Sequence, residues 1–314
     1  MNIKQFHKFH LMFSTNYDIL KSIFEFCSGT ALVKLASMGS CPKNIVKTYL
    51  QSKVENMLVT FFDRGKLSIM GTIFNLLMNN LSDLILLFYE VLSGVNGAII
   101  GLVAAKVILP GQENTWFPAD LNIAVPQGRL LPMSCFFRNH GYELSDTSMD
   151  DCYSLADIIS FSVYSNGGSM ITISESAYPD LFLAVVLASL HMGAMNFITA
   201  NNICCLYPTT TPYQKTYSFR DPMGLNEEEK GILQLCGFNL WSMFSTSQEP
   251  CGDLCPAALR QFRGLRRIGL FRWRGCGISN LGNISYSWSI GTKCSQNGCI
   301  AQDQANLIKV GSHL

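Results

Sequence analysis

Charged side chains are scarce in this 314-residue chain, since only 14% of its residues are Asp, Glu, Lys or Arg while 48% are hydrophobic. This composition excludes a largely disordered protein, because disorder requires few apolar residues and a high charge. The formal net charge is +1, which excludes a general electrostatic attraction to nucleic acid or acidic membranes. The chain can bury a large core, and we expect it to divide into two or three units.

Several familiar motifs are also missing. There is no GxxxxGKS phosphate loop, and the five histidines show no order typical of Ser-His-Asp or Cys-His enzymes. Residues 1–13 carry lysines and histidines but no long apolar core followed by a cleavage site. We therefore expect no signal peptide and an intracellular location, in the cytoplasm or nucleus.

Three apolar runs come close to the length of a membrane span. Asparagines interrupt residues 67–82, and glycines together with Asn96 interrupt residues 91–105. Residues 181–199 carry no formal charge but contain His191, Gly193 and Asn196, and a buried helix followed by a buried strand explains this run equally well. We predict no membrane span, with a membrane-associated protein as an alternative.

The amino-terminal part of the chain shows helical periodicity. From residue 17 to about residue 64, apolar residues recur at the spacing of short amphipathic helices. Ile23-Phe24-Glu25-Phe26-Cys27, followed by Leu32 to Ala36, looks like an F-box, although the usual opening Leu-Pro is missing; an ordinary helical cap is the alternative. We assign residues 1–66 to this helical F-box-like segment and residues 67–92 to an apolar insertion.

The next part, residues 93–225, has the pattern of a mixed α/β domain. Its strongest local signal is Asn166-Gly167 between two β-rich runs, 158–164 and 170–174, which predicts a hairpin. The other elements that we expect are a strand-like piece running into a glycine loop at Gly94, a helix near 98–107, a strand at 121–125, a helix near 130–139, a helix from 179 to about 191, a strand at 195–199 and a turn of helix through 203–206. After Asn226 the composition shifts to Cys, Arg and Trp, and we place a C-terminal extension at 226–314.

Asp120 and Asn122 are the most informative residues of this domain. Alternation along the strand 121–125 places their side chains on one face of a sheet. Catalysis with two metal ions requires paired carboxylates in such a position, and this chain supplies only one carboxylate and one amide. The alternative is an Asp at the start of a strand and an Asn that bonds to a turn.

The twelve cysteines are too scattered in the first two thirds of the chain for a disulfide framework. Near the end, however, Cys251 and Cys255 form one close pair and Cys294 and Cys299 form another. Four thiolates suit a structural zinc ion, and the alternative is buried thiols that act as small hydrophobic groups.

Residues 259–275 contain several arginines and aromatic residues but no acid. Such a segment could bind single-stranded nucleic acid, or it could be a solvated basic face over a strand at 268–273, which we favour. The arginines are Arg260, Arg263, Arg266, Arg267, Arg272 and Arg274.

Taken in order, these segments resemble a basidiomycete fungal family of mostly uncharacterised proteins, which join an F-box-like start to a degenerate nucleotidyltransferase-like fold. The residues that carry the resemblance are Ile23 to Ala36, Tyr49 to Asp63, Leu92-Ser93-Gly94, Phe117 to Asn122, Phe136 to Tyr142, Ile171 to Glu175, Met195 to Thr199 and Leu265 to Trp273.

The resemblance implies an α+β fold with an N-terminal helical segment, a central nucleotidyltransferase-like mixed sheet with flanking helices and a Cys/Arg-rich extension. It also implies that Gly94 belongs to the nucleotide-binding loop, that Asp120, Asn122 and Glu175 are vestigial catalytic positions, and that a Skp1-like adaptor binds the F-box-like face. Since the chain has Gly94-Val95 and Asn122 where active enzymes have a Gly-Ser or Gly-Gly pair and a second carboxylate, we expect a non-catalytic interaction module. An active metal-dependent nucleotidyltransferase is the alternative.

Overall fold

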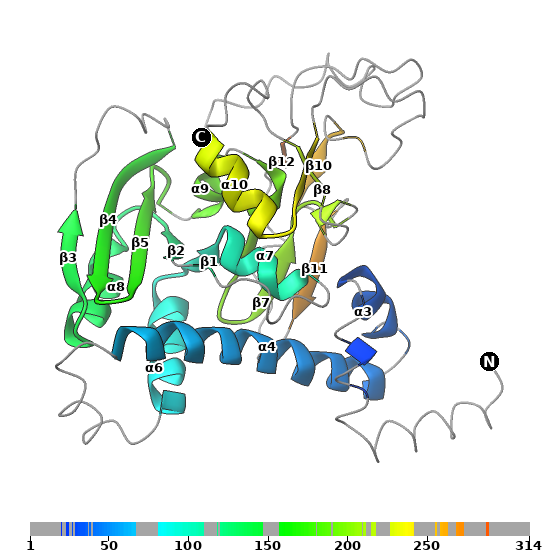
Figure 1. Ribbon diagram of the computed structural model, residues 1–314, viewed down its shortest axis with the longest axis horizontal. Coiled ribbons are helices and arrows are strands. Elements are labelled where there is room, and N and C mark those ends of the chain that lie inside the picture. Colours follow the sequence, from blue (N-terminus) through cyan, green and yellow to red (C-terminus); the bar gives the residue numbers. More distant parts are fainter. Residues whose placement is uncertain are drawn as a thin grey trace.

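A computed structural model of the protein describes most of its first 241 residues and three short pieces beyond them (Figure 1). The described ranges are 29–36, 40–66, 81–109, 120–146, 157–179, 181–189, 191–208, 210–211, 215–217, 227–241, 258–262, 268–272 and 287–288, together with Leu20, Ile23, Phe24, Cys27, Met38, Pro118 and Cys255.

These residues form a mixed α+β fold around one eight-stranded sheet with the strand order β11-β7-β6-β1-β2-β5-β4-β3. Strands β2 and β5 are parallel, and every other neighbouring pair in this sheet is antiparallel. The strands are β1 (Ala98–Ile100), β2 (Asp120–Val125), β3 (Glu143–Asp146), β4 (Ile158–Asn166), β5 (Ser169–Ser176), β6 (Asn196–Ile198), β7 (Asn202–Cys205) and β11 (Gly269–Arg272). Two small two-stranded sheets pair β8 (Lys215–Tyr217) with β9 (Asn239–Trp241), and β10 (Arg260–Gln261) with β12 (Ser287–Trp288).

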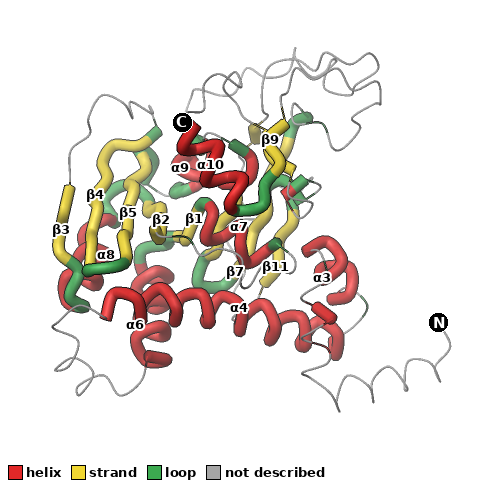
Figure 2. The backbone as a smooth tube through the Cα atoms, in the orientation of Figure 1, coloured by secondary structure: helices red, strands yellow, loops and turns green. Residues whose placement is uncertain are grey.

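Helices pack against the large sheet and bury two apolar layers (Figure 2). The first layer joins the sheet residues Ile99, Leu121, Ile123, Ile171 and Ile173 to α4 (Ser40–Lys66), α6 (Leu81–Gly94), α7 (Leu102–Ile108) and α8 (Leu130–Asn139). The second layer joins Ala98, Ala124, Phe197 and Cys204 to α9 (Leu183–Leu187) and to Phe262 and Trp288 of the β10–β12 region. Helices α3 (Gly29–Ala36) and α10 (Glu227–Leu235) and the short 3-10 helix η2 (Met192–Ala194) complete the described elements.

The long helix α4 spans one side of the sheet, as Figure 1 shows. At 1.5 Å per residue its length is about 40 Å. Its buried residues Val46, Tyr49, Leu50, Val54 and Leu58 recur at helical spacing, which gives α4 one apolar stripe against the first layer. Lys53 on the same helix donates hydrogen bonds to the carbonyl oxygens of Val107 (3.3 Å) and Leu109 (2.8 Å), so its charge caps the C-terminal end of α7.

The hairpin prediction is confirmed, because β4 and β5 are joined at Gly167 and Gly168 and pair antiparallel from Asn166↔Ser169 onward. Gly167 has a φ of 57°, a backbone conformation that residues with a side chain rarely adopt. The strand predicted at 121–125, the helix at 130–139 and the strand within 268–273 are confirmed as well.

Three elements predicted after Gly94 differ from the structure. The helix expected at 98–107 begins as strand β1 and becomes helical only after Gly101. The turn of helix expected at 203–206 is strand β7, whose four residues are all buried. The helix expected from 179 to about 191 is shortened to α9, Leu183–Leu187, and the 3-10 helix η2 follows it at Met192. Strand β11 comes from the predicted C-terminal extension yet completes the edge of the large sheet by pairing with β7.

Within the described residues, no helix combines the length and the apolar character that crossing a membrane requires. The apolar run 181–199 is divided among α9, η2 and β6, so it forms no single helix.

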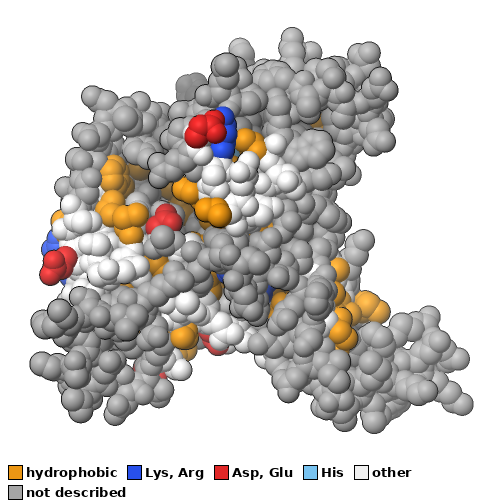
Figure 3. All heavy atoms as spheres, in the orientation of Figure 1, with side chains coloured by type: hydrophobic (Ala, Val, Ile, Leu, Met, Phe, Trp, Pro, Cys, Tyr) orange, Lys and Arg blue, Asp and Glu red, His pale blue; other side chains and the backbone are white. Residues whose placement is uncertain are grey.

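The β3–β5 side of the large sheet carries exposed apolar side chains. Leu144, Ile159 and Met170 are 40–45% exposed, and Figure 3 shows hydrophobic atoms at the surface there.

Candidate functional site

The site is built on the turn between β1 and α7. Strand β1 ends at Ile100, and Gly101 then reverses the chain with φ 76° and ψ −146°, a conformation open essentially to glycine alone. Ile100 lies opposite Asn122 in the antiparallel β1–β2 pair. A Cβ atom added to Gly101 would lie 3.9 Å from the Asn122 side-chain nitrogen, so the backbone of this turn lies close to the site residue.

Gly94 does not occupy this turn. It is the last residue of α6, and a Cβ atom added there would meet nothing within 4 Å. The prediction of a strand running into a glycine loop at 94 is therefore wrong: the strand begins at Ala98, and the glycine that follows it is Gly101.

Asp120 and Asn122 lie on the same face of β2, as predicted. The Asn122 Nδ2 donates a hydrogen bond of 2.8 Å to Asp120 Oδ2. Both side chains are partly buried. A bond to an ionised acceptor is stronger than a neutral one, so the amide holds the carboxylate in a fixed position and occupies one of its oxygens.

The neighbouring parallel strand β5 places Thr172 opposite Asn122. Glu175, the third predicted catalytic position, lies opposite Val125 instead. Five residues along a strand correspond to about 16 Å, so the structure does not bring Glu175 to Asp120.

Glu175 has a structural role in the turn between β2 and α8. Its carboxylate accepts hydrogen bonds of 2.5 Å from the Gly128 N–H and from the Ser160 hydroxyl. It therefore ties that turn to the hairpin formed by β4 and β5.

The thiol of Cys236, just after α10, responds to the charges around Asp120. Burial raises its pKa to about 12, while Lys106 of α7 lowers this pKa and Asp120 raises it. Lys106 is itself buried. A cation and an anion of the protein thus act on the same buried thiol, and Asp120 is not an isolated negative charge.

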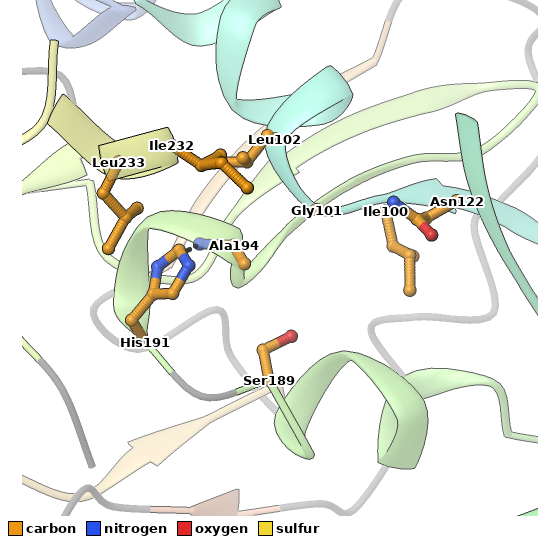
Figure 4. A pocket seen from close by; sticks show the side chains of 9 residues that line it. All are labelled: Ile100, Gly101, Leu102, Asn122, Ser189, His191, Ala194, Ile232 and Leu233. Atoms are coloured by element: carbon orange, nitrogen blue, oxygen red, sulfur yellow. Dashed lines mark hydrogen bonds between the residues drawn. The ribbon is translucent and has the colours of Figure 1, made fainter. Parts of the chain in front are cut away.

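A cavity of about 280 Å³ opens beside Asn122 (Figure 4). It lies between the β1–α7 turn, the segment after α9, η2 and α10. The described residues that line it are Ile100, Gly101, Leu102, Asn122, Ser189, His191, Ala194, Ile232 and Leu233.

His191 is the titratable group of this lining. Its Nδ1 accepts a hydrogen bond of 3.2 Å from the Ala194 N–H. Burial lowers its pKa from 6.5 to about 4, so the ring is neutral at pH 7 and its proton is on Nε2. Sequence reasoning noted His191 only as an interruption of an apolar run and overlooked Ser189, which had no local signal.

Of the predicted zinc ligands, Cys255 is buried, and Cys251, Cys294 and Cys299 lie outside the described residues. Among the residues that are described, no three His, Cys, Asp or Glu side chains are grouped so as to hold a metal ion.

Arg260 does not belong to a solvated basic face, which corrects its place in the predicted nucleic-acid surface. Its side chain is fully buried, with Cζ 4.0 Å from the centre of the Tyr207 ring. Its Nη1 donates to the carbonyl oxygens of Cys255 (3.3 Å) and Ala258 (2.9 Å). A guanidinium held in this way cannot reach a phosphate. Arg272 is exposed on β11, and the predicted partners Arg263, Arg266, Arg267 and Arg274 lie outside the described residues.

The predicted F-box face is largely turned inward. Phe24 and Leu32 are 2% and 3% exposed, and Phe24 packs edge-on against Tyr49 of α4, with ring centres 5.3 Å apart. Leu35 is partly buried against the same core, and Ile23 is 47% exposed.

Comparison with known proteins adds no relative: no family model, no curated protein and no solved structure matches this chain.

Proposed function

We propose that this chain is a non-catalytic intracellular interaction module whose central domain is a degenerate nucleotidyltransferase-like unit. The proposal is supported by the succession of β1, Gly101, α7 and β2, with Asp120 and Asn122 on one strand face. The observation that carries it is the hydrogen bond from Asn122 to Asp120.

Two-metal catalysis needs several carboxylates that share two cations about 4 Å apart. Within the described part of the chain, strands β2 and β5 place Asp120, Asn122 and Thr172 at this point, and of these three only Asp120 carries a charge. The Asn122 amide also directs an N–H group at the carboxylate, whereas a metal ligand must present an oxygen lone pair. Turning the amide over would place two oxygens in contact at 2.8 Å, which the present hydrogen bond avoids.

The direct test is a transfer assay with the full chain. Purified protein is incubated with each labelled nucleoside triphosphate, Mg²⁺ or Mn²⁺, and RNA or protein acceptors. We expect no transfer from the wild type. The control variant is Asp157→Ala, which changes an acid directly before β4. Transfer that is lost in Asp120→Ala but kept in this control would instead establish a metal-dependent nucleotidyltransferase.

We propose the helical start as the part that recruits a Skp1-like adaptor. Helix-in-groove binding needs exposed apolar anchors. Ile23 is exposed, whereas Phe24 and Leu32 would have to leave the core. A pull-down with the wild type, Ile23→Asp and the exposed control Leu131→Asp measures this directly. Binding that is lost only in Ile23→Asp supports recruitment, and failure of the wild type to bind leaves a helical cap.

We also propose one structural zinc ion held by Cys251, Cys255, Cys294 and Cys299. Elemental analysis of protein purified without chelator should then give one zinc per chain. A result without stoichiometric zinc would remove the proposal.

A further inference from the structure

The cavity beside Asn122 carries no charge on its described lining. Four of its side chains are the aliphatic groups of Ile100, Leu102, Ile232 and Leu233. Leu102 and Leu233 also pack in one apolar cluster with Ala105 and Phe238, so this wall is fixed by the core beneath it. An apolar wall favours the uncharged body of a ligand and opposes an ion that would lose its hydration there.

The polar side chains among the described lining residues are all neutral. His191 offers its Nε2–H as a donor, and within the described part of the chain nothing accepts from it. The hydroxyl of Ser189 and the amide of Asn122 provide further donor and acceptor positions. Figure 4 shows Ser189 away from the group formed by Leu102, Ile232 and Leu233, whereas Asn122 lies beside Ile100 and His191 lies beside Ala194.

The nearby charge argues against an anionic ligand. Asp120 is bonded to Asn122, and no described cation lines the cavity. A phosphate or carboxylate placed there would lie near the Asp120 carboxylate and would find no cationic side chain among the described lining residues.

The size of the cavity limits the ligand as well. Its volume of about 280 Å³ is at the lower end of small-molecule sites, which span about 300–1,000 Å³. A compound with a single ring fits this range.

We infer that this cavity is a binding site for a small uncharged ring compound that carries an amide or carbonyl group. The carbonyl oxygen accepts from His191 Nε2, the apolar ring packs on the aliphatic wall, and the amide N–H groups bond to Ser189 or Asn122. This deepens the proposed function and rests on it, because the site is then used for binding and not for phosphoryl transfer.

Three probes of nearly equal shape test the charge preference. Benzamide is neutral, benzoate is an anion and benzamidinium is a cation. Each is titrated into the full-length protein at pH 7, and binding is followed by ligand-observed NMR and calorimetry. We expect benzamide to bind at least tenfold more tightly than either charged probe. No benzamide binding, or tighter binding of benzoate or benzamidinium, would overturn the inference.

Two variants locate the binding. In His191→Asn the new side-chain oxygen can still accept from the Ala194 N–H, but the Nε2–H donor is lost, and benzamide should bind at least tenfold more weakly. Ile232→Asp changes a residue that is 43% exposed and puts a charge into the aliphatic wall, so it should abolish binding with little cost to the fold. The matched control is His140→Asn at the end of α8, which should leave benzamide binding unchanged.

If benzamide binds equally well to wild type, His191→Asn and Ile232→Asp, the compound lies elsewhere and the inference is refuted. The transfer assay distinguishes this failure from that of the proposed function. Absent transfer together with absent benzamide binding rejects only the ligand class, whereas transfer that depends on Asp120 rejects the non-catalytic function itself.

Discussion

Replacing Asn122 with Asp places a second carboxylate beside Asp120 and should convert a stabilising contact into a repulsion. The wild-type amide donates to Asp120 at 2.8 Å. Loss of a hydrogen bond to a charged group costs about 1.5–3 kcal/mol. Two carboxylates that turn apart to about 4 Å still repel by about 4 kcal/mol near a surface, and we halve this figure because both side chains are partly exposed to water.

We therefore expect Asn122→Asp to lower the free energy of unfolding by about 4 kcal/mol, and Asn122→Ala, which loses only the hydrogen bond, by about 2 kcal/mol. The measurement is urea unfolding at pH 7. The Asp variant should also gain a divalent cation site, and Mn²⁺ at a hundred times its dissociation constant would return about 2.7 kcal/mol.

The Ala variant separates the repulsion from the lost bond. An Asp variant as stable as the Ala variant would show that the two carboxylates do not face each other. Equal stabilisation of wild type and Asn122→Asp by Mn²⁺ would show that the wild type already binds a metal, and this would refute the reasoning behind a non-catalytic site.

Three further predictions concern stability. Because the folded-state pKa of His191 is lowered from 6.5 to about 4, stability should be complete above pH 6.5 and fall as the pH decreases toward 4; urea unfolding should show a loss of about 2 kcal/mol between pH 7 and pH 5 that disappears in His191→Asn. Glu175→Ala loses two hydrogen bonds and should lower the free energy of unfolding by about 2–4 kcal/mol, whereas Glu143→Ala, an exposed acid on β3, should change it by less than about 0.5 kcal/mol; equal effects would contradict the structural role of Glu175. Gly101→Ala should lower the melting temperature through about 1–3 kcal/mol of backbone strain, whereas Gly94→Ala at the end of α6 should leave the melting temperature unchanged or raise it. A larger loss of melting temperature in Gly94→Ala than in Gly101→Ala would place the conformationally required glycine at 94.

Local signals predicted the parts of the fold that local chemistry determines. The Asn166-Gly167 turn needs a positive φ at Gly167, and the sequence shows this directly. The shared face of Asp120 and Asn122 follows from strand alternation alone, and the hydrogen bond between them confirms it.

The errors arose where tertiary burial overrides periodicity. All four residues of β7 are buried between two layers, so Ile203 to Cys205 lack the alternation that marks a strand. Strand β1 has only three residues and is followed almost at once by α7, so the apolar pattern of 98–107 predicted a single helix. The glycine loop was therefore predicted at Gly94 and not at Gly101. The cavity joins His191 and Ser189 to Asn122 across roughly seventy positions of sequence, and no local pattern predicts such a juxtaposition.

The contact between α3 and β11 has a consequence for the order in which the protein can fold. Phe24 and Leu32 share one apolar cluster with Phe271, and α3 contacts β11. A ribosome that adds about 5–20 residues per second makes β11 roughly 10–50 s after α3. During that time the amino-terminal helices lack part of their buried surface. Strand β7, which ends at Cys205, lacks its neighbour on one side for only about the last 3–13 s, until β11 is made. We expect nascent chains that stop before residue 269 to depend on chaperones, because an unpaired, apolar strand edge favours aggregation.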